Sequence, residues 1–232
     1  LKLRVELTAD IDLTASSFAS IPIFNGYFDG KKHNISGYSY GGDGYVTGFF
    51  RYIGENGDIT GLNISGTLRA VDDMQVTGGI AGINYGTIFG CTFDGTIEGD
   101  TETGGIVGIN ETSGSVLSCT NNSRISGYYS TGGIAGKNYG LIYSCINKGY
   151  INDSKDWVET DDEKSADIIQ DITGDSPTDG KLQSGIDTGG IAGMSKGYIR
   201  NCANYGTVGY EHVGYNIGGI AGRQSGAVEN CT

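Results

Sequence analysis

The sequence is poor in several residue types that build common functional sites. Its 232 residues include only 2 histidines, 2 prolines, 2 methionines and 1 tryptophan. Imidazole is the most frequent proton-transfer and metal-binding side chain, and His33 and His212 stand near opposite ends of the chain. A site that needs two histidines is therefore not expected. The scarcity of proline excludes collagen-like chains and proline-rich linkers.

Positive charge and long apolar runs are also scarce. Lys and Arg total 15 against 27 Asp and Glu, which gives a formal charge of −12. Such a chain repels phosphate backbones, so we expect no nucleic-acid partner. Apolar residues come in short runs, well below the ~18 residues that span a bilayer, so no membrane segment is predicted. The chain begins at Leu1 and Cys231 closes an unfinished repeat, and we expect a fragment of a longer protein.

Glycine, by contrast, is abundant, and it marks an internal repeat. The 42 glycines make up roughly 18% of the chain against a usual ~7%. Five aligned segments each begin at a corner of the Thr-Gly-Gly-Ile type and end at a cysteine: 77–91, 103–119, 131–145, 188–202 and 217–231. Successive starts differ by 26, 28, 57 and 29 residues, so the third interval is a doubled spacing.

Each repeat holds three short apolar strands separated by Gly or Asn punctuation, and such a unit cannot bury its own apolar face. The copies must therefore stack, each strand pairing in parallel with its counterpart one coil away. This predicts an all-β, single-stranded parallel β-helix of about seven coils of 26–30 residues. Three inward columns are expected: Ile80, Ile106, Ile134, Ile191 and Ile220; Ile88, Val116, Ile142, Ile199 and Val228; and Ile97, Ile125, Ile151 and Val208.

The unit Thr-Gly-Gly-Ile-Ala-Gly-x-Asn-x-Gly-x-Ile-x-x-Cys resembles the GLUG repeat of bacterial surface proteins. That repeat also occurs in the N-terminal region of IgA1-specific metallopeptidases. The resemblance implies a right-handed β-helix on an exported, extracellular protein at the bacterial cell surface. The zinc chemistry of those relatives lies in a separate domain, and His-Glu-x-x-His is absent from this sequence.

We expect one β-helix domain over residues 1–232, with a leading coil at 1–45, GLUG-type coils at 46–151 and 188–232, and an acidic insertion at 152–187. Thr160-Asp-Asp-Glu163 reads as a capping box that opens a short helix in the insertion. The insertion is a solvated loop, or it contacts a partner or Ca²⁺. The candidate partner-binding residues are Trp157, Asp161, Asp162, Glu163, Tyr128 and Tyr129.

Two further columns invite a chemical interpretation. The cysteines 91, 119, 145, 202 and 231 share one repeat position, where Leu62 stands in an earlier copy. Buried free thiols are favoured over disulfides or a metal ladder, because side chains on adjacent parallel strands point the same way. Asn84, Asn110 and Asn138 also align, and a turn-capping amide ladder is favoured over a ligand site.

No catalytic residue, metal site or cofactor is predicted. A carbohydrate-active β-helix enzyme would need paired carboxylates on one outward face. The residues after the third strand are Glu98, Ser126, Asn152 and Gly209, while Asp94, Asp100, Asp153 and Asp187 are expected in scattered turns.

The predicted function is a non-catalytic structural or binding module of adhesion or stalk type, monomeric, with an unknown host or envelope protein or glycan as partner. Tyr139, Tyr143 and Tyr198 are candidates for a sugar- or protein-contacting face. The alternatives are a carbohydrate-active β-helix enzyme fragment and a spacer beside an IgA1-protease-like metallopeptidase domain.

Overall fold

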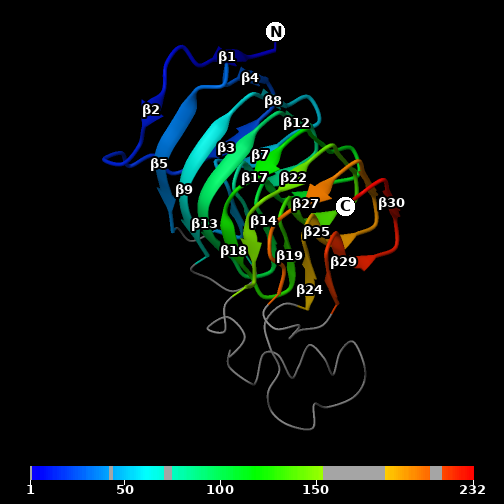
Figure 1. Cartoon of the computed structure of the whole chain (residues 1–232). Coiled ribbons are helices and arrows are strands. Elements are labelled where there is room, and N and C mark those ends of the chain that lie inside the picture. Colours follow the sequence, from blue (N-terminus) through cyan, green and yellow to red (C-terminus); the bar gives the residue numbers. More distant parts are fainter. Residues whose placement is uncertain (1, 42–43, 71–74, 154–185, 210–215) are drawn as a thin grey trace.

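The computed structural model is an all-β parallel solenoid (Figure 1). It describes residues 2–41, 44–70, 75–153, 186–209 and 216–232. These residues form strands β1 to β30 and contain no helix. The described residues therefore include no helix that is long and apolar enough to cross a membrane. The predicted fold class is confirmed. The right-handed winding remains a prediction from the repeat resemblance.

The strands assemble into four parallel sheets, which we call A to D. Sheet A contains β1 (Arg4–Glu6), β4 (Tyr27–Asp29), β8 (Asp58–Thr60), β12 (Thr87–Phe89), β16 (Ser115–Leu117), β21 (Leu141–Tyr143), β26 (Tyr198–Arg200) and β30 (Ala227–Glu229). Sheet B contains β2 (Ile11–Asp12), β5 (Asn34–Tyr40), β9 (Asn63–Arg69), β13 (Thr92–Glu98), β17 (Thr120–Asn121), β18 (Arg124–Ser126), β22 (Ile146–Asn147), β23 (Tyr150–Ile151) and β27 (Ala203–Asn204).

Sheets C and D complete the circuit. Sheet C contains β3 (Ile21–Phe24), β7 (Phe50–Ile53), β11 (Ala81–Asn84), β15 (Val107–Asn110), β20 (Ala135–Asn138), β25 (Ala192–Ser195) and β29 (Ala221–Gln224). Sheet D contains β6 (Val46–Thr47), β10 (Val76–Gly78), β14 (Glu102–Gly104), β19 (Ser130–Gly132), β24 (Asp187–Gly189) and β28 (Ile217–Gly218). One turn of the chain visits D, C, A and B in that order, as β10, β11, β12 and β13 do.

Equivalent positions of successive copies lie over one another. Thr77 pairs with Thr103, Thr103 with Thr131, and Thr131 with Thr188. The same register holds in sheet A, where Ile88 pairs with Val116. Among the described residues the four sheets contain six to nine strands each. A full turn contributes to every sheet, so the six strands of sheet D correspond to about six full turns, with partial turns at the ends. The doubled interval in the sequence is thus an insertion between coils, because β19 pairs directly with β24.

The interior is filled by the three predicted columns, which are confirmed. Ile80, Ile88 and Ile97 are fully buried, as are their counterparts in the next two coils, and in the coil after those Ile191 and Ile199 are fully buried as well. The partly buried Ile220, Val208 and Val228 pack against this core at the C-terminal end. Aromatic side chains fill the first coils, with the Phe24 and Phe50 rings 5.4 Å apart.

The corner between sheets D and C is tight. A Cβ added to Gly79 would lie 2.4 Å from the carbonyl oxygen of Gly105 and 2.4 Å from the ring of Phe93. Real Cβ atoms do not approach other heavy atoms so closely, so only glycine fits at this position.

The acidic insertion leaves the stack in register. Ile151, the last residue before the insertion, bridges to Val208. Asp187, predicted as the last residue of the insertion, is already the first residue of β24 and pairs with Ser130. The predicted helix at Thr160 and the residues around it lie outside the described residues.

Candidate functional site

The outward face of sheet A is the first candidate site. Each sheet A strand has three residues, and the central one points into the core, as Ile59, Ile88 and Val116 do. The first and third residues therefore face outward. Because the strands pair in register, these outward residues form two parallel columns. One column contains Arg4, Tyr27, Asp58, Thr87, Ser115, Leu141, Tyr198 and Ala227. The other contains Glu6, Asp29, Thr60, Phe89, Leu117, Tyr143, Arg200 and Glu229.

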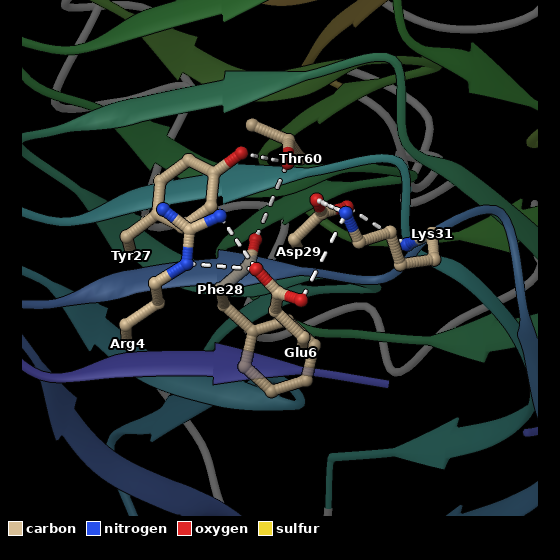
Figure 2. A network of polar contacts seen from close by, with 7 residues as sticks. All are labelled: Arg4, Glu6, Tyr27, Phe28, Asp29, Lys31 and Thr60. Carbon is tan, nitrogen blue, oxygen red and sulfur yellow. Dashed lines mark hydrogen bonds and ion pairs between the residues drawn. The ribbon is translucent and has the colours of Figure 1, made fainter. Parts of the chain in front are cut away.

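The N-terminal part of this face is polar and internally paired (Figure 2). The guanidinium of Arg4 lies over the ring of Tyr27 at 4.8 Å and also binds the Glu6 carboxylate. Lys31 extends between Asp29, at 3.0 Å, and Glu6, at 3.9 Å. The pKa of Asp29 is lowered, chiefly because its carboxylate accepts a hydrogen bond from the Lys31 backbone N–H. Exposed ion pairs of this kind contribute little stability, and they leave few unpaired charges for a ligand.

The middle of the face is uncharged and mostly apolar, with Thr87 and Ser115 as its polar residues. Phe89, Leu117, Leu141, Tyr143 and Tyr198 occupy outward positions on the four adjacent strands β12, β16, β21 and β26, and we call them the aromatic patch. Phe89 is 49% exposed, Tyr143 40% and Tyr198 54%. No charged residue occupies an outward position of β12, β16 or β21, all of which the structure describes.

Cations border the patch at its C-terminal side. The guanidinium of Arg200 lies 5.2 Å from the centre of the Tyr198 ring and pairs with Glu229 at 3.1 Å. The ammonium of Lys196 lies 5.9 Å from the ring centre of Tyr139 in the turn that leads into sheet A. The face thus offers flat aromatic and aliphatic surface with hydrogen-bonding groups at one end.

A cleft at the corner between sheets D and C is the second candidate. It has a volume of about 320 Å³. Its lining consists of Thr101, Glu102, Tyr129, Ser130, Lys137, Ile186, Asp187 and Arg223. In sheet D, Glu102, Ser130 and Asp187 are consecutive in one column, and in sheet C, Lys137, Met194 and Arg223 are consecutive in another.

Each carboxylate of this corner cleft is matched with a cation. Lys137 reaches back one coil to Glu102 at 2.5 Å, and Arg223 reaches back one coil to Asp187 at 2.7 Å. Asn216 donates a further hydrogen bond to Asp187 at 2.9 Å. Burial raises the pKa of Asp187, while the contacts with Asn216 and Arg223 oppose that rise. The two carboxylates of the cleft are therefore neutralised by cations of the same chain.

The position of Asp187 differs from the sequence-based expectation. Asp187 and Asp94 were expected in turns, but Asp187 lies in β24 and Asp94 in β13. The reason for Asp187 is that Ser130 offers it a strand partner immediately after the insertion. Glu98, by contrast, meets no second carboxylate in its row, because its strand neighbours in register are Arg69 and Ser126.

The structure separates the predicted tyrosines into two groups. The rings of Tyr128 and Tyr129 lie 6.1 Å apart, and Tyr129 lines the corner cleft. Tyr143 and Tyr198 lie in the aromatic patch, with Tyr139 at its border. The predicted partner-binding residues Trp157, Asp161, Asp162 and Glu163 lie outside the described residues, as does His212.

The cysteine and asparagine columns are internal. All five thiols are free, and Cys91, Cys119, Cys145 and Cys202 are buried. Burial raises the pKa of the Cys91 and Cys145 thiols. The amide of Asn110 donates to Oδ1 of Asn138 at 2.9 Å, and both residues are fully buried. The predicted amide ladder is confirmed, and the predicted burial of the thiols is confirmed for four of the five, because Cys231 is only partly buried. In the described part of the chain no three His, Cys, Asp or Glu residues form a group that could hold a metal.

Sequence reasoning missed a second ladder and most of both candidate sites. Asn121 donates to Asn147 at 2.7 Å, and Asn147 donates to Asn204 at 2.8 Å. A signal was available, because each of these residues stands two positions after a cysteine. For the corner cleft, the signal was the residue that precedes the repeat threonine, which is Glu102, Ser130 and Asp187 in three successive copies.

Comparison with known proteins gives one fold relationship. No protein-family model matches the chain, and no curated protein does. A solved structure described as a "putative immunoglobulin A1 protease from Bacteroides ovatus" aligns with a TM-score of 0.64 at 18% sequence identity. The alignment covers 100% of this chain and 68% of that one. At this identity the likeness shows the fold alone.

Proposed function

We propose that the chain is a non-catalytic binding module, of adhesion or stalk type, in an exported bacterial cell-surface protein. The observation that carries this proposal is the aromatic patch, in which five large apolar side chains hold outward positions on four adjacent strands. Monomeric soluble proteins rarely expose contiguous apolar patches larger than a few hundred Å², and patches of that size are often binding sites. The acidic groups of the corner cleft are paired with Lys137 and Arg223, which favours binding over turnover.

The extracellular location rests on a resemblance of the repeat and a similarity of the fold. The repeat resembles the GLUG unit of bacterial surface proteins, and the fold is similar to a protein described as an immunoglobulin A1 protease candidate from Bacteroides ovatus. A stacked solenoid also suits a spacer, because its length grows by ~4.8 Å per coil without any change in cross-section.

The test uses the source bacterium and an antibody raised against the chain. Intact cells are treated with an external protease and compared with lysed cells. We expect the antibody signal to be lost from intact cells while a cytoplasmic control protein survives. Retention of the signal in intact cells and loss after lysis would contradict a surface location.

Absence of turnover requires its own test. The chain is incubated with panels of polysaccharides and peptides, in parallel with Asp187→Asn and Glu102→Gln variants. We expect no product above the no-protein control from any of the three proteins. Product formation that either substitution abolishes would replace the binding role with a catalytic one centred on the corner cleft.

A second role is favoured by the fold comparison. The chain would then be a spacer beside a protease domain, as the description of the similar structure suggests, and the repeat resemblance implies that this domain is a metallopeptidase. A zinc-binding His-Glu-x-x-His signature elsewhere in the full-length gene supports that role. Deletion of the segment would then shorten the reach of the peptidase and leave its cleavage of a small soluble peptide unchanged.

A further inference from the structure

The aromatic patch has a spacing that selects its ligand. Phe89, Leu117 and Tyr143 are consecutive in one column of sheet A. Adjacent strands lie ~4.8 Å apart, so Phe89 and Tyr143 are about 9.6 Å apart along the solenoid axis. Each strand is hydrogen-bonded to neighbours on both sides, so this spacing is set by the backbone.

The charge of the patch narrows the ligand further. The outward positions of β12, β16 and β21 carry no charge, while the whole chain carries −12. A polyanionic ligand would be repelled by the molecule as a whole, and a polycation would find no acidic partner within the patch. An uncharged polymer meets neither penalty.

The backbone of the patch limits the way in which a ligand can bind. The N–H and C=O groups of β12, β16 and β21 already pair along the sheet, so a peptide cannot add to this face as a strand. A ligand must instead pack on side chains. Sugar rings do so, because the C–H groups on one face of a pyranose pack on aromatic rings while their hydroxyl groups remain hydrated.

We propose that the aromatic patch binds a neutral β-1,4-linked polysaccharide that lies across the strands, along the solenoid axis. In a two-fold chain of this linkage, as in β-1,4-glucan or β-1,4-mannan, every second sugar presents the same face, which matches aromatic rings placed two coils apart at Phe89 and Tyr143. On the next strand Arg200 follows Tyr143 in the same column and, with Glu229, supplies hydrogen-bonding groups. Tyr198 lies beside this row, in the neighbouring column, with the Arg200 guanidinium over its ring. This inference rests on the proposed binding role and gives it a ligand class.

The test is calorimetric titration of the intact chain with cellohexaose and mannohexaose, which are neutral and β-1,4-linked with a two-fold repeat. Maltohexaose tests the linkage and polygalacturonate tests the charge. Phe89→Ala and Tyr143→Ala are each expected to weaken binding about fivefold, which corresponds to about 1 kcal/mol for the loss of one aromatic contact. Because both side chains point outward, neither substitution should disturb the core. Thermal melts check that each variant remains folded.

Tyr150→Ala and Tyr205→Ala are the matched controls. These tyrosines are 52% and 72% exposed, and neither belongs to sheet A. Their substitution is expected to leave the affinity unchanged. Binding that Tyr150→Ala weakens as much as Tyr143→Ala does would overturn the placement on sheet A.

Different outcomes test the ligand class and the proposed non-catalytic surface-module role separately. Binding of neither β-1,4-linked oligosaccharide, or equal binding of maltohexaose, overturns the ligand class and leaves the surface-module role in place. Shortening of the oligosaccharides during titration would overturn the non-catalytic role, and the patch variants would still report where the sugar binds.

Discussion

The side-chain amide of Asn84 donates a hydrogen bond to Oδ1 of Asn110, one coil away, at 2.9 Å. Asn110 repeats the contact with Asn138, and Asn138 donates to the hydroxyl of Ser195 at 3.1 Å. All four side chains are fully buried. The ladder therefore ties successive coils together at the corner that leads into sheet A, because a buried amide must find its partners within the protein.

Asn110→Ala is expected to lower the free energy of unfolding by about 2 to 3 kcal/mol, because it removes the buried hydrogen bonds that Asn110 makes with Asn84, with Asn138 and with the carbonyl of Gly114. Asn122→Ala is the control, since Asn122 is exposed in the same coil. Chemical denaturation of both variants measures the difference. An equal and small effect of the two substitutions would show that the ladder contributes no net stability.

Four threonines of the repeat present the opposite case. The Oγ1 atoms of Thr47, Thr77, Thr103 and Thr131 are buried, and no hydrogen-bond partner is found for them among the described residues. Thr103→Val keeps the shape and removes a polar group that costs free energy to bury. We expect it to raise the free energy of unfolding by about 1 kcal/mol. The exposed Thr112 gives the control Thr112→Val, and a loss of stability in Thr103→Val would contradict this reasoning.

Asp187 predicts a pH dependence of stability. Its folded-state pKa is raised, first by burial, so the folded state holds this proton more tightly than the unfolded chain does. The resulting contribution to the free energy of unfolding is fully present below the ordinary carboxyl pKa of about 4 and is lost as the pH rises through the folded-state pKa of Asp187. Asp187→Asn lacks this loss, so its stability relative to the unsubstituted chain should increase from pH 4 upward. Parallel unfolding titrations measure it, and a constant or decreasing difference is the contrary result.

The cysteine column predicts one accessible thiol. Cys231 is partly exposed, whereas the other four thiols are buried, so only Cys231 should react quickly with a thiol reagent in the native protein. All five should react after denaturation without a reducing agent. Two or more fast native thiols, or fewer than five after denaturation, would contradict buried free cysteines.

The stacking of the repeats was predictable because it depends on residues that recur in every copy. Ile80, Ile88 and Ile97 reveal their columns by position alone, and Leu62 in a cysteine position reveals burial. The candidate sites depend on residues that differ between copies. Phe89, Leu117 and Arg200 occupy equivalent positions of different copies, but they are three different residue types. The sequence pattern therefore does not show that they lie on one face, and only the strand register does.

The corner cleft was hidden for a different reason. Lys137 lies in sheet C and its partner Glu102 in sheet D, and their contact crosses both a corner and a coil boundary. The alignment of repeats compares equivalent positions only, so it cannot reveal a contact between two different columns. The network of Arg4, Glu6 and Lys31 was likewise hidden, because it lies in the leading coil, which carries no copy of the repeat.

The stacking itself is tested most directly by spin-label distances along one outward column. Labels are placed in a Cys231→Ser background at Ala227 together with Thr87, Asp58 or Tyr27, which lie four, five and six strands away in sheet A. Stacked coils predict backbone separations of about 19, 24 and 29 Å, rising by one strand spacing at each step. Distances that fail to rise in this order would contradict the solenoid and, with it, the placement of the aromatic patch.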